Sequence, residues 1–169
     1  MARRREVASS LCLGIAVTIA KYPLAKEANV GRSIGRSELE RLLDKGDVAK
    51  DLGVVFLELN PDRVVATMPI DERHLQPFGY LHGGVSVVLA ESVASIGAFL
   101  NCPPSKGAFG SEINASHLRR KCAGGSLAAV GTPVHVGKRS QVWEVRIEDE
   151  EGKPVCASRC SVAIVDLEA

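Results

Sequence analysis

The segment LHGGVSVVLAESVASIGAFLN, residues 81–101, contains one carboxylate, Glu91, in an otherwise uncharged and mostly apolar run. An ionised carboxylate among apolar side chains is costly unless something compensates it. One interpretation is structural: Glu91 meets solvent or pairs with a basic residue such as Arg119 or Arg120. The other is chemical: its surroundings tune its proton affinity for work as a base or a nucleophile. The residues alone leave both interpretations open.

Other groups that could do chemistry lie on the same segment. It is long, rich in Ala, Leu and Val and free of proline, which predicts one helix from about Gly84 to Leu100. Ser95 follows Glu91 by one turn on the same face, where its hydroxyl could hold a water beside the carboxylate. The HGG residues open the helix, and the free N–H groups of a first turn suit a developing oxyanion. The segment therefore contains a candidate water-activating pair and a candidate oxyanion hole.

These two groups are far apart along the helix. Gly83 and Glu91 are separated by eight residues, which corresponds to about 12 Å of helix. They cannot act on one carbonyl within a single chain. If both are catalytic, the site combines two subunits, and an antiparallel pair of such helices would build two equivalent sites in a dimer.

The sequence around this helix predicts strands. LGVVFLEL and RVVATMPI, joined by the turn-forming NPD, read as an antiparallel hairpin, and four further β-type runs follow the helix. The helix is apolar nearly all round, so it must be surrounded by protein. We therefore expect an α+β fold of the order ββαββββ, in which an antiparallel sheet curls around one central helix.

The N-terminal part differs from the rest. Residues 1–36 combine an Arg-rich start with about ten mostly apolar residues, the outline of a targeting segment, without a clean cleavage site. We predict an N-terminal extension at 1–36, either poorly ordered or targeting-like, and one domain at 37–169. That domain would begin with a short helix capped by Ser37 and Glu40.

Composition narrows the function classes. The chain has 21 basic and 20 acidic residues, which argues against nucleic acid or stable membrane association as its main partner. Five cysteines without a CxxC pair suggest reduced structural thiols and a cytoplasmic location, with an organelle-targeted form as the alternative. No pattern indicates a metal site. Trp143, in an alternating strand, is expected in the core or an interface, and His74, in a polar loop, is expected to face solvent without a role.

Three stretches, QPFGYLHGGVSVVLAES, SEINASHLR and VGKRSQVWEV, together resemble a known family. They are similar to the hotdog-fold acyl-CoA thioesterases of the PaaI-like superfamily, in the branch of the 4-hydroxybenzoyl-CoA and 1,4-dihydroxy-2-naphthoyl-CoA thioesterases. The resemblance runs from about Asp51 to Asp166. It implies the hotdog fold and hydrolysis of an aromatic acyl-CoA with no cofactor beyond the coenzyme A of the substrate. It also implies a homodimer or homotetramer whose sites are shared between subunits.

The same resemblance implies roles for individual residues. Glu91 would be the general base or the nucleophile, and the Gly83 N–H would polarise the thioester carbonyl. The other catalytic candidates are Gln76, His82 and Ser95. The candidates for binding coenzyme A or the acyl group are Gly110, His117, Arg119, Gly137, Lys138, Arg139, Ser140, Phe78, Ile96 and Phe109. For the Lys-Arg pair a solvated basic turn is the plain alternative, and for His117 and Arg119 it is strand-surface solubility.

Two alternatives to an aryl-CoA thioesterase remain. One is a broader thioesterase for medium-chain or phenylacetyl-type acyl-CoA. The other is a non-catalytic hotdog module that binds acyl-CoA, although binding alone does not need a costly carboxylate. The related phenylacetic-acid branch carries Asp where this chain has Glu91, which favours the aryl branch. A dehydratase is disfavoured, because the Asp and His pairing expected of that activity is not recognisable.

Overall fold

The computed structural model describes residues 48–167, which contain one long helix and six strands. The predicted extension at 1–36 and the helix expected from Ser37 lie outside these residues. In chain order the elements are α3 (Val48–Asp51), β1 (Val55–Asn60), β2 (Arg63–Pro69), a 3-10 turn η1 (Glu72–His74), α4 (Gly83–Leu100), β3 (Lys106–His117), β4 (Ser126–Val136), β5 (Ser140–Asp149) and β6 (Pro154–Asp166).

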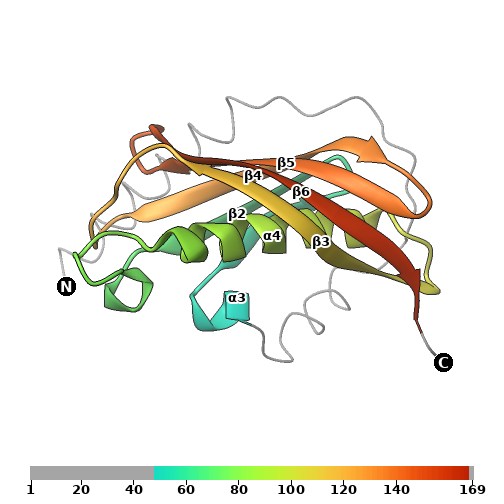
Figure 1. Ribbon diagram of the computed structural model, residues 1–169, viewed down its shortest axis with the longest axis horizontal. Helices are drawn as coiled ribbons and strands as arrows, with labels where there is room; N and C mark the ends of the chain where they lie inside the picture. Colours follow the sequence, from blue (N-terminus) through green and yellow to red (C-terminus); the bar gives the residue numbers. More distant parts are fainter. Residues whose placement is uncertain (1–47, 168–169) are drawn as a thin grey trace.

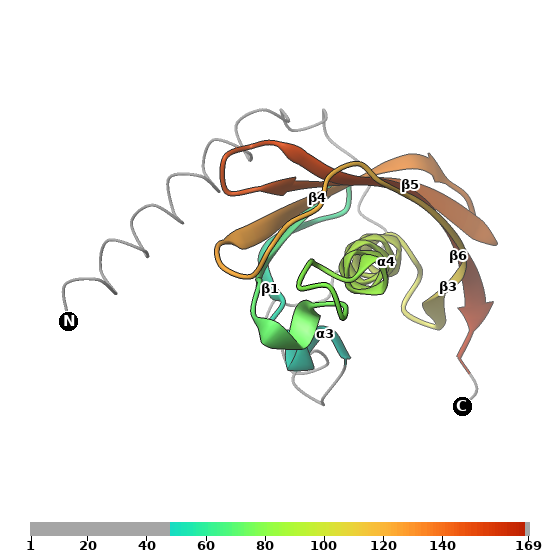
Figure 2. The ribbon, with the colours of Figure 1, turned by 60° about the vertical axis from the view of Figure 1, so that its left-hand side comes forward.

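The six strands form one antiparallel sheet with the order β1-β2-β4-β5-β6-β3. Figure 1 shows the sheet passing across α4, and Figure 2, which looks nearly along the helix, shows it curving around α4. The predicted antiparallel sheet curled around one central helix is therefore confirmed, in the predicted order of strands and helix.

The helix packs closely against the sheet because small residues face it. A Cβ atom added at Gly97 would lie 2.4 Å from Cη2 of Trp143, so glycine is what makes room for the indole ring. Trp143 is fully buried, its Nε1 donates to Gln141 Oε1 at 3.1 Å, and Gln141 Nε2 donates to the Ala98 carbonyl at 3.1 Å. The core position predicted for Trp143 is confirmed, and its polar atom is satisfied.

The sheet does not cover all of α4. Residues spaced by three and four along the helix, including Val88, Glu91, Ser95 and Phe99, are only partly buried. Among the described residues, α4 is the one helix long and apolar enough to cross a membrane, but a core helix meets the same criteria. The partly buried stripe is where the candidate site lies.

Strand β3 is an edge of the sheet and pairs with β6. The register of this pair shifts between Gly110 and Glu112, which marks a β-bulge. Bulges re-aim neighbouring side chains and are common next to active sites. This one lies on the strand segment that faces Glu91.

Candidate active site

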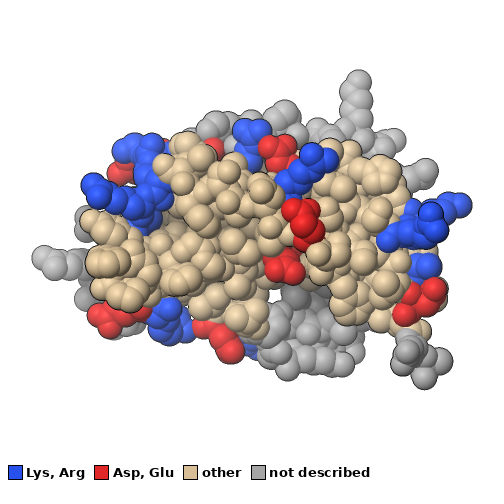
Figure 3. Space-filling view, in the orientation of Figure 1, with Lys and Arg blue, Asp and Glu red and all other residues tan. Residues whose placement is uncertain are grey.

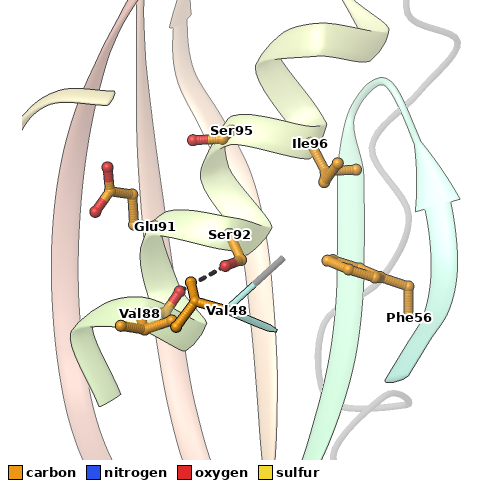
Figure 4. A pocket seen from close by; sticks show the side chains of 7 residues that line it. All are labelled: Val48, Phe56, Val88, Glu91, Ser92, Ser95 and Ile96. Atoms are coloured by element: carbon orange, nitrogen blue, oxygen red, sulfur yellow. Dashed lines mark hydrogen bonds between the residues drawn. The ribbon is translucent and has the colours of Figure 1, made fainter. Parts of the chain in front are cut away.

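A pocket of about 340 Å³ lies along the partly buried stripe of α4. Figure 4 shows Glu91 and Ser95 pointing to one side of the helix and Ile96 pointing toward Phe56 of β1 on the other. The pocket is lined by Val48, Phe56, Val88, Glu91, Ser92, Ser95 and Ile96. One end is therefore polar, with a carboxylate and hydroxyl groups, and the other is apolar and partly aromatic.

Glu91 has room beside it because residue 110 on β3 is glycine. A Cβ atom at Gly110 would lie 2.2 Å from Glu91 Oε1. Across the part of the chain that the structure describes, no ion pair involves Glu91. Arg119 is exposed, and the Arg120 guanidinium lies 5.4 Å from the centre of the Tyr80 ring. The structural interpretation of Glu91 as one half of an ion pair with these arginines is therefore not supported within one chain.

The hydroxyl groups near Glu91 differ in availability. Ser92 Oγ donates to the Val88 carbonyl at 2.7 Å, which engages its proton within the helix. Ser95 lines the pocket one turn beyond Glu91, as the helical spacing predicted. Ser95 is thus the better placed of the two to hold a water beside the carboxylate.

Cys160, whose thiol feels the charge of Glu91, is not in the reactive thiolate form. Cys160, on β6, is fully buried, and burial together with the negative charges of Glu91 and Glu112 raises its pKa to about 11. The thiol is therefore neutral at ordinary pH, whereas the reactive form of cysteine is the thiolate. Of the residues that line the pocket in the described part of the chain, Glu91 alone has an ionisable side chain.

A second group of residues gathers at the first turn of α4. His82 is the N-cap, and its Nδ1 accepts the Gly84 N–H at 2.9 Å. A Cβ atom at Gly83 would lie 2.7 Å from Nε2 of His117, so the His117 ring rests on the backbone of Gly83. Gln76 Oε1 accepts the Phe78 N–H in the preceding loop. The structure thus brings His117 to the start of the helix, which its place in the sequence did not reveal.

A third group lies at the other end of α4. Gly137, Lys138 and Arg139 border a pocket of about 410 Å³. Its other lining residues are Asn101, Cys102, Pro103, Lys106, Val136, Gln141 and Ile164. Lys138 and Arg139 are exposed, and Ser140 begins β5 beside them. The predicted phosphate-binding turn therefore borders a pocket, whereas Arg119 does not line it.

Comparisons with known proteins agree with this geometry. Residues 78–156 match the family described as the Thioesterase superfamily. The chain is 47% identical over 113 residues to a 1,4-dihydroxy-2-naphthoyl-CoA hydrolase of Listeria monocytogenes, an alignment that covers 67% of this chain and 91% of the relative. The chain belongs to the thioesterase superfamily. It is therefore a hydrolase of thioesters.

Further relatives and solved structures extend this assignment. A 1,4-dihydroxy-2-naphthoyl-CoA hydrolase of Escherichia coli is 42% identical over 123 residues, covering 73% of this thioesterase and 90% of the relative. A crystal structure of a thioesterase from Haemophilus influenzae superposes with a TM-score of 0.75 at 36% identity, covering 83% of this chain and 96% of that one. The hotdog fold expected from the resemblance is thus confirmed.

The apolar end of the pocket differs from the expectation drawn from the sequence. Ile96 lines it, but Phe78 is 85% exposed in its loop and Phe109 pairs with Ala163 on the sheet face away from α4. Within one chain, Phe78 and Phe109 do not line the pocket. Phe56 and Val48 do, and sequence reasoning missed both. Phe56 lies in the run predicted as a strand, and the curvature of the sheet brings it opposite Ile96.

The expectation for His74 was wrong. Its side chain is fully buried and hydrogen-bonded at both ring nitrogens. Its polar neighbours in the sequence suggested exposure. The buried position arises because the loop folds back onto the segment between α3 and β1.

Proposed function

We propose that this thioesterase hydrolyses an acyl-CoA with an aromatic acyl group, of the hydroxybenzoyl or dihydroxynaphthoyl type, to the free acid and coenzyme A. The observation that carries the proposal is the Glu91 carboxylate in a pocket whose other end is formed by Phe56 and Ile96. Two relatives named 1,4-dihydroxy-2-naphthoyl-CoA hydrolase support the same substrate class.

Two mechanisms are open to Glu91, one as a general base and one as a nucleophile. As a general base, Glu91 takes a proton from a water held with Ser95, and the oxygen of that water adds to the thioester carbonyl. Collapse of the tetrahedral intermediate then expels the coenzyme A thiolate. As a nucleophile it displaces the thiolate itself, and water then hydrolyses the resulting anhydride. In both cases the carbonyl oxygen becomes an oxyanion, which the Gly83 N–H and the Gln76 side chain would stabilise.

The site would be shared between two chains. In α4, Gly83 is the first residue and Glu91 lies eight residues later, about 12 Å along the axis. Strand β3 offers an open edge of twelve residues, and a strand edge of that length favours pairing with another strand. The face that shows α4 and β3 in Figure 1 is mostly uncharged in Figure 3. We propose that two copies pair there with antiparallel α4 helices, as a homodimer or as half of a homotetramer.

Coenzyme A would bind with its phosphates near the basic turn. Lys138 and Arg139 are both exposed at the rim of their pocket and supply two cations close together. Such cations suit phosphate groups. This proposal gives His117 a place at the thioester end, against Gly83, and not at the nucleotide end.

The decisive experiment replaces Glu91. Glu91→Gln keeps the shape of the side chain and removes its basicity, so kcat on 4-hydroxybenzoyl-CoA and 1,4-dihydroxy-2-naphthoyl-CoA should fall by about 10²- to 10⁴-fold. Release of thiol measures the rate, and circular dichroism checks the fold. Glu151→Gln is the matched control, because Glu151 is exposed at the turn between β5 and β6, away from β3, and pairs with Lys153. A Glu91→Gln enzyme with a near-normal rate would contradict the mechanism.

A panel of substrates separates the alternatives. Medium-chain and phenylacetyl-CoA hydrolysed as fast as the aryl esters would favour the broader thioesterase. Tight binding of acyl-CoA without thiol release would indicate the non-catalytic module.

The proposed binding of the acyl group at the apolar end of the pocket can be tested separately. Phe56→Ala enlarges the apolar end of the pocket and removes an aromatic contact, so we expect kcat/KM for aryl-CoA to fall by about tenfold, with a smaller loss for medium-chain acyl-CoA. The ratio of the two kcat/KM values is the measurement. An unchanged ratio would mean that the acyl group binds elsewhere.

A further inference from the structure

We infer that His74 is a positioning residue that holds the oxyanion-binding half of the site in place through the loop 75–81. The inference rests on the proposed function, because it assigns Gln76 and Gly83 to that half. His74 itself does not touch the pocket around Glu91. Its effect would pass through the backbone of the first turn of α4.

The His74 ring is fixed from both sides. Nδ1 accepts the Asp71 N–H at 2.9 Å, and Nε2 lies 2.9 Å from the Leu52 carbonyl oxygen. Because a carbonyl only accepts, Nε2 is the donor in that contact, while Nδ1 also lies 3.1 Å from Asp71 Oδ1. The ring is therefore held at both nitrogens and is fully buried between two backbone segments that are 19 residues apart in sequence, at Leu52 and Asp71.

The backbone of His74 is tied directly to the start of α4. Its carbonyl accepts the His82 N–H at 2.8 Å, and Leu75 and Leu81 form a bridge just inside that bond. Within the loop, the Gln76 N–H donates to the Tyr80 carbonyl at 2.8 Å. The loop is thus closed at its base by His74 and His82.

This closure connects the buried ring to the proposed oxyanion hole. His82 is the N-cap of α4 and Gly83 is its first residue, while Gln76 lies two residues beyond His74. Loss of the ring would free the base of the loop and shift both proposed oxyanion donors together. A displacement of about 1 Å at such donors can cost about 100-fold in rate.

Three substitutions separate the two ring contacts. His74→Asn keeps an acceptor near Asp71 N–H, His74→Gln keeps a donor that can reach the Leu52 carbonyl, and His74→Ala removes both. We expect kcat to fall about 10- to 100-fold for His74→Ala and less for the other two, with KM changed less than threefold. Arg73→Ala is the matched control, because Arg73 also links this turn to the preceding segment, by donating to the Asp51 carbonyl, but is exposed. It should retain activity within about twofold.

The activity regained in mixed dimers is a measurement that a general loss of stability would not explain. An equimolar mixture of Glu91→Ala and Gln76→Ala chains should regain about a quarter of wild-type activity, since half of the dimers are hybrids and each has one intact site. His74→Ala mixed with Glu91→Ala should be rescued likewise. His74→Ala mixed with Gln76→Ala should not be rescued, because both defects fall in the same half of the site.

The outcomes distinguish the inference from the function on which it rests. Suppose that the Glu91 and Gln76 mixture is rescued but the His74 and Glu91 mixture is not. This result would overturn the role of His74, and the two-chain site would still be supported. If the Glu91 and Gln76 mixture fails despite proven subunit exchange, the two-chain site is wrong, and a double variant of His74 and Gln76 decides the inference. If the activity losses of the two single variants add in that double variant, the inference about His74 is overturned. It is also overturned if all three His74 variants lose activity only in proportion to the loss of folded protein.

Discussion

At the scale of single residues, the candidate site depends on a glycine beside a carboxylate. Gly110 leaves the space that Glu91 occupies, as the distance of 2.2 Å from a built Cβ atom to Oε1 shows. The sequence suggested that Gly110 packs against the acyl group. The structure adds that its nearest side-chain neighbour within the chain is the proposed catalytic carboxylate.

Gly110→Ala tests this contact. The contacting atom is the end of a flexible side chain, so the Glu91 carboxylate can move aside and the fold should survive. The moved carboxylate would no longer meet water and thioester in the right geometry, and we expect kcat to fall about 10- to 100-fold. Thermal unfolding should change by less than about 2 °C. Full activity would show that Glu91 works from another rotamer.

The sequence also led to a prediction about the cysteines, namely that they are reduced structural thiols. Among the described residues, Cys102, Cys122, Cys156 and Cys160 form no disulfide with one another, and all but Cys122 are buried. Burial raises the pKa of Cys156 as well as that of Cys160. Reduced thiols stay a prediction with which these four positions are compatible, and Cys12 lies outside the described residues.

At the scale of elements, α4 was the most predictable part of the chain. Its absence of proline and its apolar composition defined a helix from about Gly84 to Leu100, and the structure has Gly83–Leu100. The sequence did not reveal which neighbours the helix would have. The meeting of Gly97 with Trp143 joins residues 46 positions apart, and only the curvature of the sheet brings them together.

Gly97→Ala probes that packing and contrasts with Gly110→Ala. The new methyl group would lie 2.4 Å from a rigid, fully buried indole ring that cannot retreat. Overpacking costs about 1–3 kcal/mol, and the better helix propensity of alanine returns about 1 kcal/mol at most. We expect a net loss of about 1–2 kcal/mol and a decrease in Tm of about 3–6 °C.

Thermal and urea unfolding measure this effect, and kcat per folded molecule should stay within about twofold. A variant as stable as the wild type would mean that the indole and the helix separate at little cost. The pair of glycine variants thus distinguishes a residue that shapes the site from one that shapes the core.

At the scale of the whole molecule, one chain holds two incomplete halves of the proposed site. Glu91 and Ser95 lie in the middle of α4, whereas Gly83, His82 and His117 lie at its start. The partly buried stripe on α4 and the open edge of β3 are the surfaces on which a second copy would complete both halves.

Activity should therefore depend on assembly. When the enzyme is diluted below the dissociation constant of its dimer, specific activity should fall in parallel with the fraction of dimer, because a monomer holds no complete site. Mass photometry measures the assembly, and thiol release at the same concentrations measures the rate. In saturating substrate, the fall in specific activity should occur at a lower enzyme concentration, since substrate binds only the assembled site. A fully active monomer would refute the shared site.

The sequence by itself determined the helix, the order of strands around it and the chemical types at the site, because periodicity and composition are local properties of the chain. It also indicated, from helix geometry alone, that Gly83 and Glu91 cannot act together in one chain. Only the tertiary structure decided which residues surround these groups. It placed Phe56 and not Phe109 in the pocket, His117 on Gly83 and His74 in the interior. These contacts join distant segments through the curvature of the sheet and the folding of one loop, and no local pattern in the sequence records either.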